Sequence, residues 1–135
     1  MDVPVGFRLV DVMPHMHYIG ARARMTVTFP DGRVEPVIGI DDWDLRWQNI
    51  YVLRDPLRIP AGSRIDAWFV WDNSGANIDN PFNPPRPMKW GWKSEEEMAE
   101  IWMGIIPDDP SQRNRLIEAS YKSWYSTDSL PMPRR

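Results

Sequence analysis

The stretch Arg22-Ala23-Arg24-Met25-Thr26-Val27-Thr28-Phe29-Pro30-Asp31-Gly32 decides the fold class of this chain. Its residues 22–29 carry β-branched side chains in an alternating pattern, which is typical of a strand. Pro-Asp-Gly then makes a tight turn, because proline presets φ and glycine accepts a positive φ. Residues 33–40 return as the partner strand, so this stretch predicts a β-hairpin.

Further strands are expected on both sides of the hairpin. Residues 3–12 predict a first strand that runs into a histidine segment, and residues 47–53 and 64–72 predict two more, with a turn at 59–63. Residues 94–106 carry opposing signals, since Ser94-x-x-Glu97 is a capping box for a helix whereas residues 101–106 are typical of a buried strand. Short strands with strong turns predict an all-β fold, an antiparallel, jelly-roll-like β-sandwich.

The C-terminal part of the chain changes character. Asp109 is suited to cap a helix, Pro110 suits its first position, and apolar residues then recur at helical spacing. We predict one amphipathic helix over residues 110–125, packed on the β core or on a partner. The chain therefore divides into a β-sandwich over residues 1–107 and a C-terminal helix and tail over residues 108–135. The long Asn- and Pro-rich loop at 73–92 is expected to pack down, because apolar side chains are embedded in it.

The composition of the chain limits its possible functions and partners. A chain of 135 residues with 26% charged residues is one soluble-type domain. The net charge of −3 predicts neither nucleic acid nor an anionic membrane as a partner. With no cysteine, disulfides and thiolate metal sites are excluded. The sequence opens without a recognisable signal peptide, which fits a domain excised from a longer protein.

Both histidines of the chain lie one residue apart, in Pro14-His15-Met16-His17-Tyr18-Ile19-Gly20. In a strand, residues i and i+2 share a face, so the two imidazoles would project together. Two adjacent imidazoles form half of a site for zinc, copper, iron or nickel. The pair alone leaves two interpretations open, a metal half-site and two surface histidines.

Four segments in chain order extend this pattern. They are the His-Met-His segment, Trp47-Gln48-Asn49-Ile50-Tyr51, Trp71-Asp72-Asn73-Ser74 and Trp90-Gly91-Trp92-Lys93-Ser94-Glu95-Glu96-Glu97-Met98. Together they resemble the C-terminal domain of the copper type II, ascorbate-dependent monooxygenases, the peptidylglycine hydroxylating and dopamine β-monooxygenase family. The bacterial branch is the more similar one. The resemblance covers roughly residues 13–107 and leaves out the C-terminal helix.

The resemblance implies a ligand set for one copper ion, at which the family activates oxygen. Carried over by motif, the ligands are His15, His17 and Met98. A soft thioether favours Cu(I), and three protein ligands leave a position open. The resemblance also favours a strand over residues 95–106. Gln48 and Tyr51 are candidates to orient the site from a second shell, with plain strand positions as the alternative.

Several family features are absent from the sequence. Phe69 and Ala99 stand where the family has a disulfide, and Met13, Glu100 and Trp102 stand where its peptide-hydroxylating members bind a substrate carboxylate. A peptide C-terminus is therefore not the expected substrate. No histidine remains for the family's second copper, so we expect a partner domain elsewhere in the full-length protein and no turnover by this domain alone.

Three function classes stay open on the sequence. The first is a copper-binding half of a monooxygenase that hydroxylates C–H bonds of an unknown small molecule, in an extracytoplasmic location by resemblance. The second is a non-catalytic copper-holding or partner-binding β-sandwich. The third is a zinc site of the same histidines with a carboxylate. Separately, Asp41, Asp42 and Asp44 form either a solvated corner or a site for a hard cation.

Overall fold

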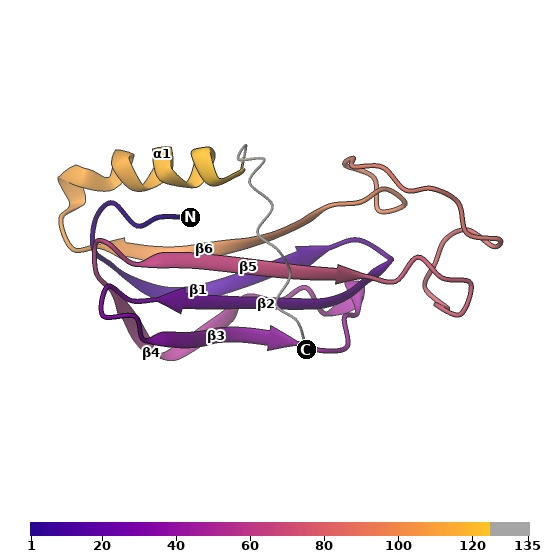
Figure 1. Cartoon of the computed structure of the whole chain (residues 1–135), viewed down its shortest axis with the longest axis horizontal. Coiled ribbons are helices and arrows are strands. Elements are labelled where there is room, and N and C mark those ends of the chain that lie inside the picture. Colours follow the sequence, from indigo (N-terminus) through magenta and orange to yellow (C-terminus); the bar gives the residue numbers. More distant parts are fainter. Residues whose placement is uncertain (125–135) are drawn as a thin grey trace.

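The computed structural model describes residues 1–124 as a β-sandwich of two three-stranded antiparallel sheets with one C-terminal helix. The predicted fold class is confirmed (Figure 1). The elements, in chain order, are β1 (Phe7–Met16), β2 (Gly20–Thr28), β3 (Val34–Ile40), the 3-10 helix η1 (Leu45–Trp47), β4 (Tyr51–Ile59), β5 (Arg64–Trp71), β6 (Ala99–Pro107), the 3-10 helix η2 (Pro110–Gln112) and α1 (Arg113–Trp124).

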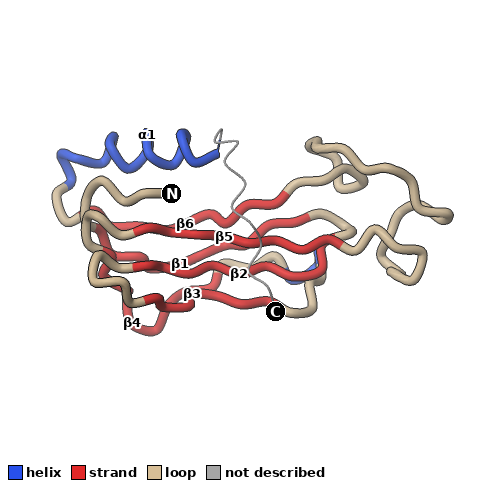
Figure 2. Tube along the Cα trace, viewed as in Figure 1, coloured by secondary structure: helices blue, strands red, loops and turns tan. Residues whose placement is uncertain are grey.

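The two sheets have the strand orders β4-β1-β6 and β3-β2-β5. Each central strand, β1 or β2, is therefore paired on both sides. The long connection between β5 and β6 projects beyond one end of the sandwich, while α1 lies along the opposite half (Figure 2). Of the residues that the structure describes, no helix is long and apolar enough to cross a bilayer.

The core between the sheets is organised by the inward face of β1. Phe7 and Leu9 are fully buried, and a bulge between Leu9 and Asp11 shifts the alternation so that Val12 and Met16 also face inward. Burying each such side chain contributes roughly 1.5–3 kcal/mol. The main cluster comprises Val3, Val5, Phe7, Leu9, Val12, Met25, Val27, Phe29, Ile59, Ile65 and Leu116.

A second, smaller cluster lies under the histidine segment. Met16, Ala23 and Trp43 form it, and Phe69 and Ala99 pack against it. Phe69 and Ala99, the positions where the copper monooxygenases that the sequence resembles carry cysteines, thus pack against the same small cluster. One does so with a large side chain and the other with a small one. Apolar packing fills this end of the sandwich without a disulfide.

The predicted turns are confirmed by their backbone conformations. Gly32 has φ +86° between β2 and β3, and Gly62 has φ +83° between β4 and β5. The amide of Phe29 donates to the carbonyl of Arg33 at 2.8 Å, which closes the hairpin. Glycine is needed at both places because other residues rarely adopt a positive φ.

The predicted C-terminal helix is present and packs on the β core through Leu116. Its first turn is the 3-10 helix η2 in place of the predicted α-helix. The carboxylate of Asp109 accepts from the amide of Ser111 at 2.9 Å, and Pro110 opens η2 before the chain continues into α1. Leu116 is the only buried residue of α1 and inserts into the main cluster. Tyr125 and the tail at 126–135 lie outside the described residues.

Three local predictions are wrong. The strand placed at 47–53 is replaced by η1 and by β4, which starts at Tyr51. Asp44 caps η1, and β4 continues through Pro56 because an edge strand tolerates a missing amide. The strand predicted over residues 95–106 is confirmed as β6, but its predicted start is wrong because β6 begins only at Ala99.

The third error concerns the long loop, which does not pack down throughout. Ile78 is 95% exposed, and Trp90 and Trp92 are also exposed, whereas Phe82 and Met88 are partly covered. The apolar content of the loop was therefore a poor guide to its burial.

Candidate metal centre

His15 and His17 lie on the outer face of the β4-β1-β6 sheet. Met16 between them is fully buried toward the core, so its two neighbours point to the other side. Their ring centroids are 5.0 Å apart, in an edge-to-face arrangement. The spacing in the sequence has thus brought both imidazoles together at the end of the central strand β1, with His17 directly after its last residue.

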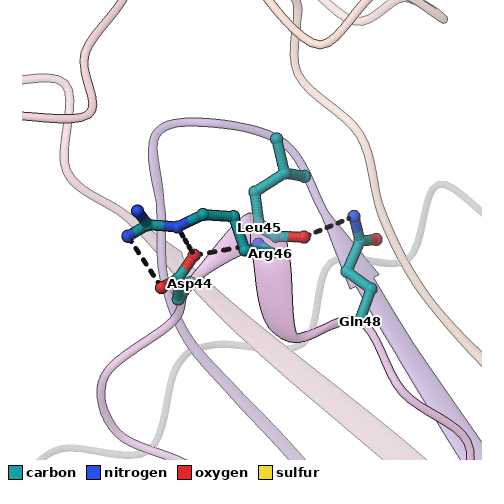
Figure 3. A network of polar contacts seen from close by, with 4 residues as sticks. All are labelled: Asp44, Leu45, Arg46 and Gln48. Carbon is teal, nitrogen blue, oxygen red and sulfur yellow. Dashed lines mark hydrogen bonds and ion pairs between the residues drawn. The ribbon is translucent and has the colours of Figure 1, made fainter.

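Gln48 fixes the orientation of the His15 ring. Its side-chain oxygen is hydrogen-bonded to Nδ1 of His15, and its side-chain nitrogen donates to the carbonyl of Leu45 at 3.0 Å (Figure 3). Because the nitrogen of the amide is already used, the oxygen faces the imidazole and Nδ1 of His15 is the donor. The capped turn of η1, held by Asp44, presents Gln48 directly after its last residue.

The ring of His17 is held by the main chain of the loop. His17 is 4% exposed, and its Nδ1 lies 2.9 Å from the carbonyl oxygen of Glu96. A carbonyl oxygen can only accept, so Nδ1 of His17 carries the proton. Both histidines therefore keep Nε2 as the nitrogen with a free lone pair, which is the usual arrangement of a metal-ligating histidine.

Met98 reaches the same region from the other side of the ladder. Antiparallel pairing sets Met16 opposite Ala99 as the last pair of the ladder, and His17 and Met98 directly flank that pair in the sequence. Met98 is 7% exposed, so its thioether is buried near the end of this ladder and away from bulk water.

In the part of the chain that the structure describes, no carboxylate joins the two histidines as a third metal ligand. Within residues 1–124, no group of three His, Cys, Asp or Glu side chains is arranged to hold one ion. Glu100 is paired with His15 across β1 and β6, but its Oε1 accepts from the indole of Trp102 at 2.7 Å. The zinc alternative, which needs a carboxylate with the two histidines, lacks that third ligand in the described residues.

Two of the three carboxylates in the acidic corner at residues 41–44 are paired with arginines. Asp41 is paired with Arg24 at 2.6 Å, and Asp44 with Arg46 at 2.8 Å. The hydrogen bond from Arg24 lowers the pKa of Asp41, and the hydrogen bond from Arg46 lowers the pKa of Asp44. This geometry favours the solvated corner over a cation site.

Tyr51 is not brought to the histidines. It is paired with Val12, a core residue, and so lies on the inward side of the sheet, opposite to the face that carries His15. Its hydroxyl donates to the carbonyl of Trp47 at 3.3 Å. Tyr51 thereby supports the segment that carries Gln48 without contacting an imidazole through a hydrogen bond.

Two features of the Glu-Glu-Glu segment were not found from the sequence. One is the Glu96 carbonyl, a main-chain acceptor that no residue type signals. The other is Glu97, whose carboxylate oxygens are both buried without a hydrogen-bond partner among the described residues. Burial raises the pKa of Glu97 to about 7. Three consecutive glutamates gave no sign of which one turns inward.

This region therefore combines two neighbouring imidazoles with free Nε2 atoms and, at the end of the same ladder, a buried thioether. Comparisons with family models, curated proteins and solved structures find no match to this chain. The family resemblance consequently rests on the sequence motifs alone, and the case for a metal rests on the geometry of the residues.

Proposed function

We propose that this chain binds one copper ion through His15, His17 and Met98, as the half of a copper- and ascorbate-dependent monooxygenase that activates oxygen. One observation carries the proposal. Each histidine has its Nδ1 bound to an oxygen acceptor, so the Nε2 atom of each keeps a free lone pair for a metal. Such acceptors fix the ring orientation of metal-ligating histidines and raise their basicity.

The chemistry of the donors supports copper over zinc. A thioether is a soft ligand suited to Cu(I), and imidazole binds copper in both oxidation states. When bound, copper would supply one-electron redox chemistry and an open position for a small molecule. Hydroxylation of a C–H bond by oxygen and a reductant is the reaction class that follows from the resemblance.

The chain's own residues would preorganise this centre. Gln48 and the Glu96 carbonyl hold the imidazoles by hydrogen bonds to Nδ1, and Met16 anchors the strand between them in the smaller cluster. Low exposure of His17 and Met98 limits the access of bulk water. Packing of Phe69 and Ala99 against one cluster is compatible with a family member that has lost its disulfide.

The substrate differs from a peptide C-terminus in this proposal. Met13 is paired with Trp102 on the ladder between β1 and β6, two residues along each strand from the pair His15 and Glu100. These side chains offer a thioether, an indole whose N–H already donates to Glu100, and a carboxylate, so none of them supplies a free donor or cation for a carboxylate group. A second copper domain of the full-length protein would supply the further electron, in an extracytoplasmic compartment.

A second candidate is a copper-holding or partner-binding module without catalysis. It is favoured by the presence of only two histidines, too few for another copper site of the family type. Exposed tryptophans add to it, with Trp47, Trp90, Trp92 and Trp102 all at least half exposed. Detection of a histidine-bearing neighbour domain in the full-length gene would favour the monooxygenase instead.

The test of the ligand set is X-ray absorption of the Cu(I)-loaded chain. We expect a sulfur scatterer together with imidazole nitrogens. Met98→Leu should lose the sulfur signal while keeping the fold, because the two side chains have similar volumes. Met88→Leu, in the same loop, is the matched control and should keep the signal. A sulfur signal that survives Met98→Leu would contradict the proposed ligand.

A further inference from the structure

The loop between β5 and β6 lines a cavity of about 470 Å³ that is half open to solvent. The loop projects beyond the end of the sandwich (Figure 1). The volume falls within the usual range of small-molecule sites. Its walls are mostly charged, with three cations and two carboxylates: Arg86, Lys89, Lys93, Glu95 and Glu96.

Glu96 is already used within the loop. Its carboxylate lies 3.5 Å from Nζ of Lys89 and accepts from the amide of Lys93 at 3.2 Å. It packs directly against Gly91, where any side chain would clash with it. The Glu96 carboxylate therefore offsets the charge of Lys89.

Arg86 and Lys93 are left as the cations available to a ligand. The guanidinium of Arg86 stacks on the ring of Phe82, 3.3 Å from the centroid, and this contact orders it. The carbonyl of Arg86 accepts from the side chain of Asn73 at 2.9 Å, which ties the backbone down. In residues 1–124, neither Arg86 nor Lys93 has an ion-pair partner within 4.0 Å.

We propose that this cavity binds a small oxyanion, the phosphate or carboxylate group of a small molecule, between Arg86 and Lys93. A guanidinium fork matches both groups by two parallel hydrogen bonds, and an ammonium adds a point charge. The cavity exceeds a bare phosphate, so it has room for the body of the molecule. Glu95 on the wall disfavours ligands that carry excess negative charge. Binding of this oxyanion needs no metal and is separate from the proposed copper site.

The test is a titration of the metal-free chain followed by amide NMR. Inorganic phosphate and succinate are added in turn, with chloride in the reference sample at matched ionic strength. We expect saturable shifts confined to the amides of residues 86–96 with at least one of the two probes. Arg86→Gln with Lys93→Gln should weaken that binding at least tenfold, because both ligand charges are removed.

The control removes the same two residue types elsewhere. Arg54→Gln with Lys122→Gln takes exposed side chains from β4 and α1 and should leave the affinity unchanged. The amide spectrum of each variant also reports whether it is folded. Shifts that stay linear with concentration, or that spread over the whole surface, would overturn the proposal. Equal affinity of the two double variants would overturn it as well.

Discussion

Gln48→Leu should weaken Cu(I) binding about 10–100-fold, the range typical of losing a residue that orients a metal ligand. The side chain makes two hydrogen bonds, one with Nδ1 of His15 and one with the carbonyl of Leu45. Leucine keeps the bulk of the side chain and removes both. The imidazole of His15 is then free to rotate and to shift its proton from Nδ1 to Nε2, the nitrogen that copper needs.

The magnitude can be divided between binding and folding. A 10–100-fold loss of affinity corresponds to about 1.4–2.7 kcal/mol. Loss of two half-buried hydrogen bonds costs roughly 1–3 kcal/mol of folding free energy, at about 0.5–1.5 kcal/mol each. A domain of this size tolerates that cost, so the variant should fold and remain measurable.

Two assays on the same samples separate these effects. Competition with a colorimetric chelator gives the Cu(I) affinity, and ¹⁵N NMR of the metal-free protein gives the tautomer of each imidazole. Gln48→Glu keeps an oxygen acceptor and should bind no more weakly than the wild type. Gln112→Leu, near the start of α1, is the remote control. Unchanged affinity and an unchanged His15 tautomer in Gln48→Leu would refute the orienting role.

Three further predictions concern the fold and the loaded state. Leu116→Ala should lower the free energy of unfolding, measured by urea denaturation, by roughly 2–5 kcal/mol. The control Ile117→Ala removes an exposed side chain and should change it little. Equal effects of the two substitutions would contradict the anchoring of α1 through one side chain. Gly32→Ala should lower the free energy of unfolding by roughly 1–2 kcal/mol, because φ is +86° at this position. Gly39→Ala, with open space around it and no positive φ, is the control and should be nearly neutral. A neutral Gly32→Ala would show that the hairpin turn is not formed as described. Cu(I) at a hundred times its Kd should stabilise the chain by about 2.7 kcal/mol in thermal unfolding, reversibly with excess chelator, and no shift would count against binding to the folded state.

The sheets were predictable where local signals and topology agree. Gly32 and Gly62 mark their turns through a conformation that glycine alone adopts easily, and both turns are confirmed. The start of β4 was not predictable, because Asp44 caps a turn of helix over residues that have strand propensity. Its continuation through Pro56 depends on β4 being an edge strand, which only the assembled sheet reveals.

The candidate site was predictable to the extent that it depends on side-chain type. The i, i+2 spacing of His15 and His17 directly implies a shared face, and the motif singled out Met98. The buried carbonyl of Glu96 has no signature in the sequence because every residue carries one. Gln48 was named as a candidate for orienting the site, but its role arises from a capped turn where the sequence favoured a strand.

The most direct test of the copper hypothesis is Cu(I) affinity, measured by competition with a colorimetric chelator on the wild type, Met98→Ala and His15→Ala. The two imidazoles are neighbours and the Met98 thioether is buried near the end of the same ladder, so we predict one tightly bound ion that is held more weakly in both variants. Circular dichroism of each variant would show that the sandwich is intact. Binding that is indifferent to Met98, or no binding at all, would contradict the three-ligand centre and leave a β-sandwich interaction module.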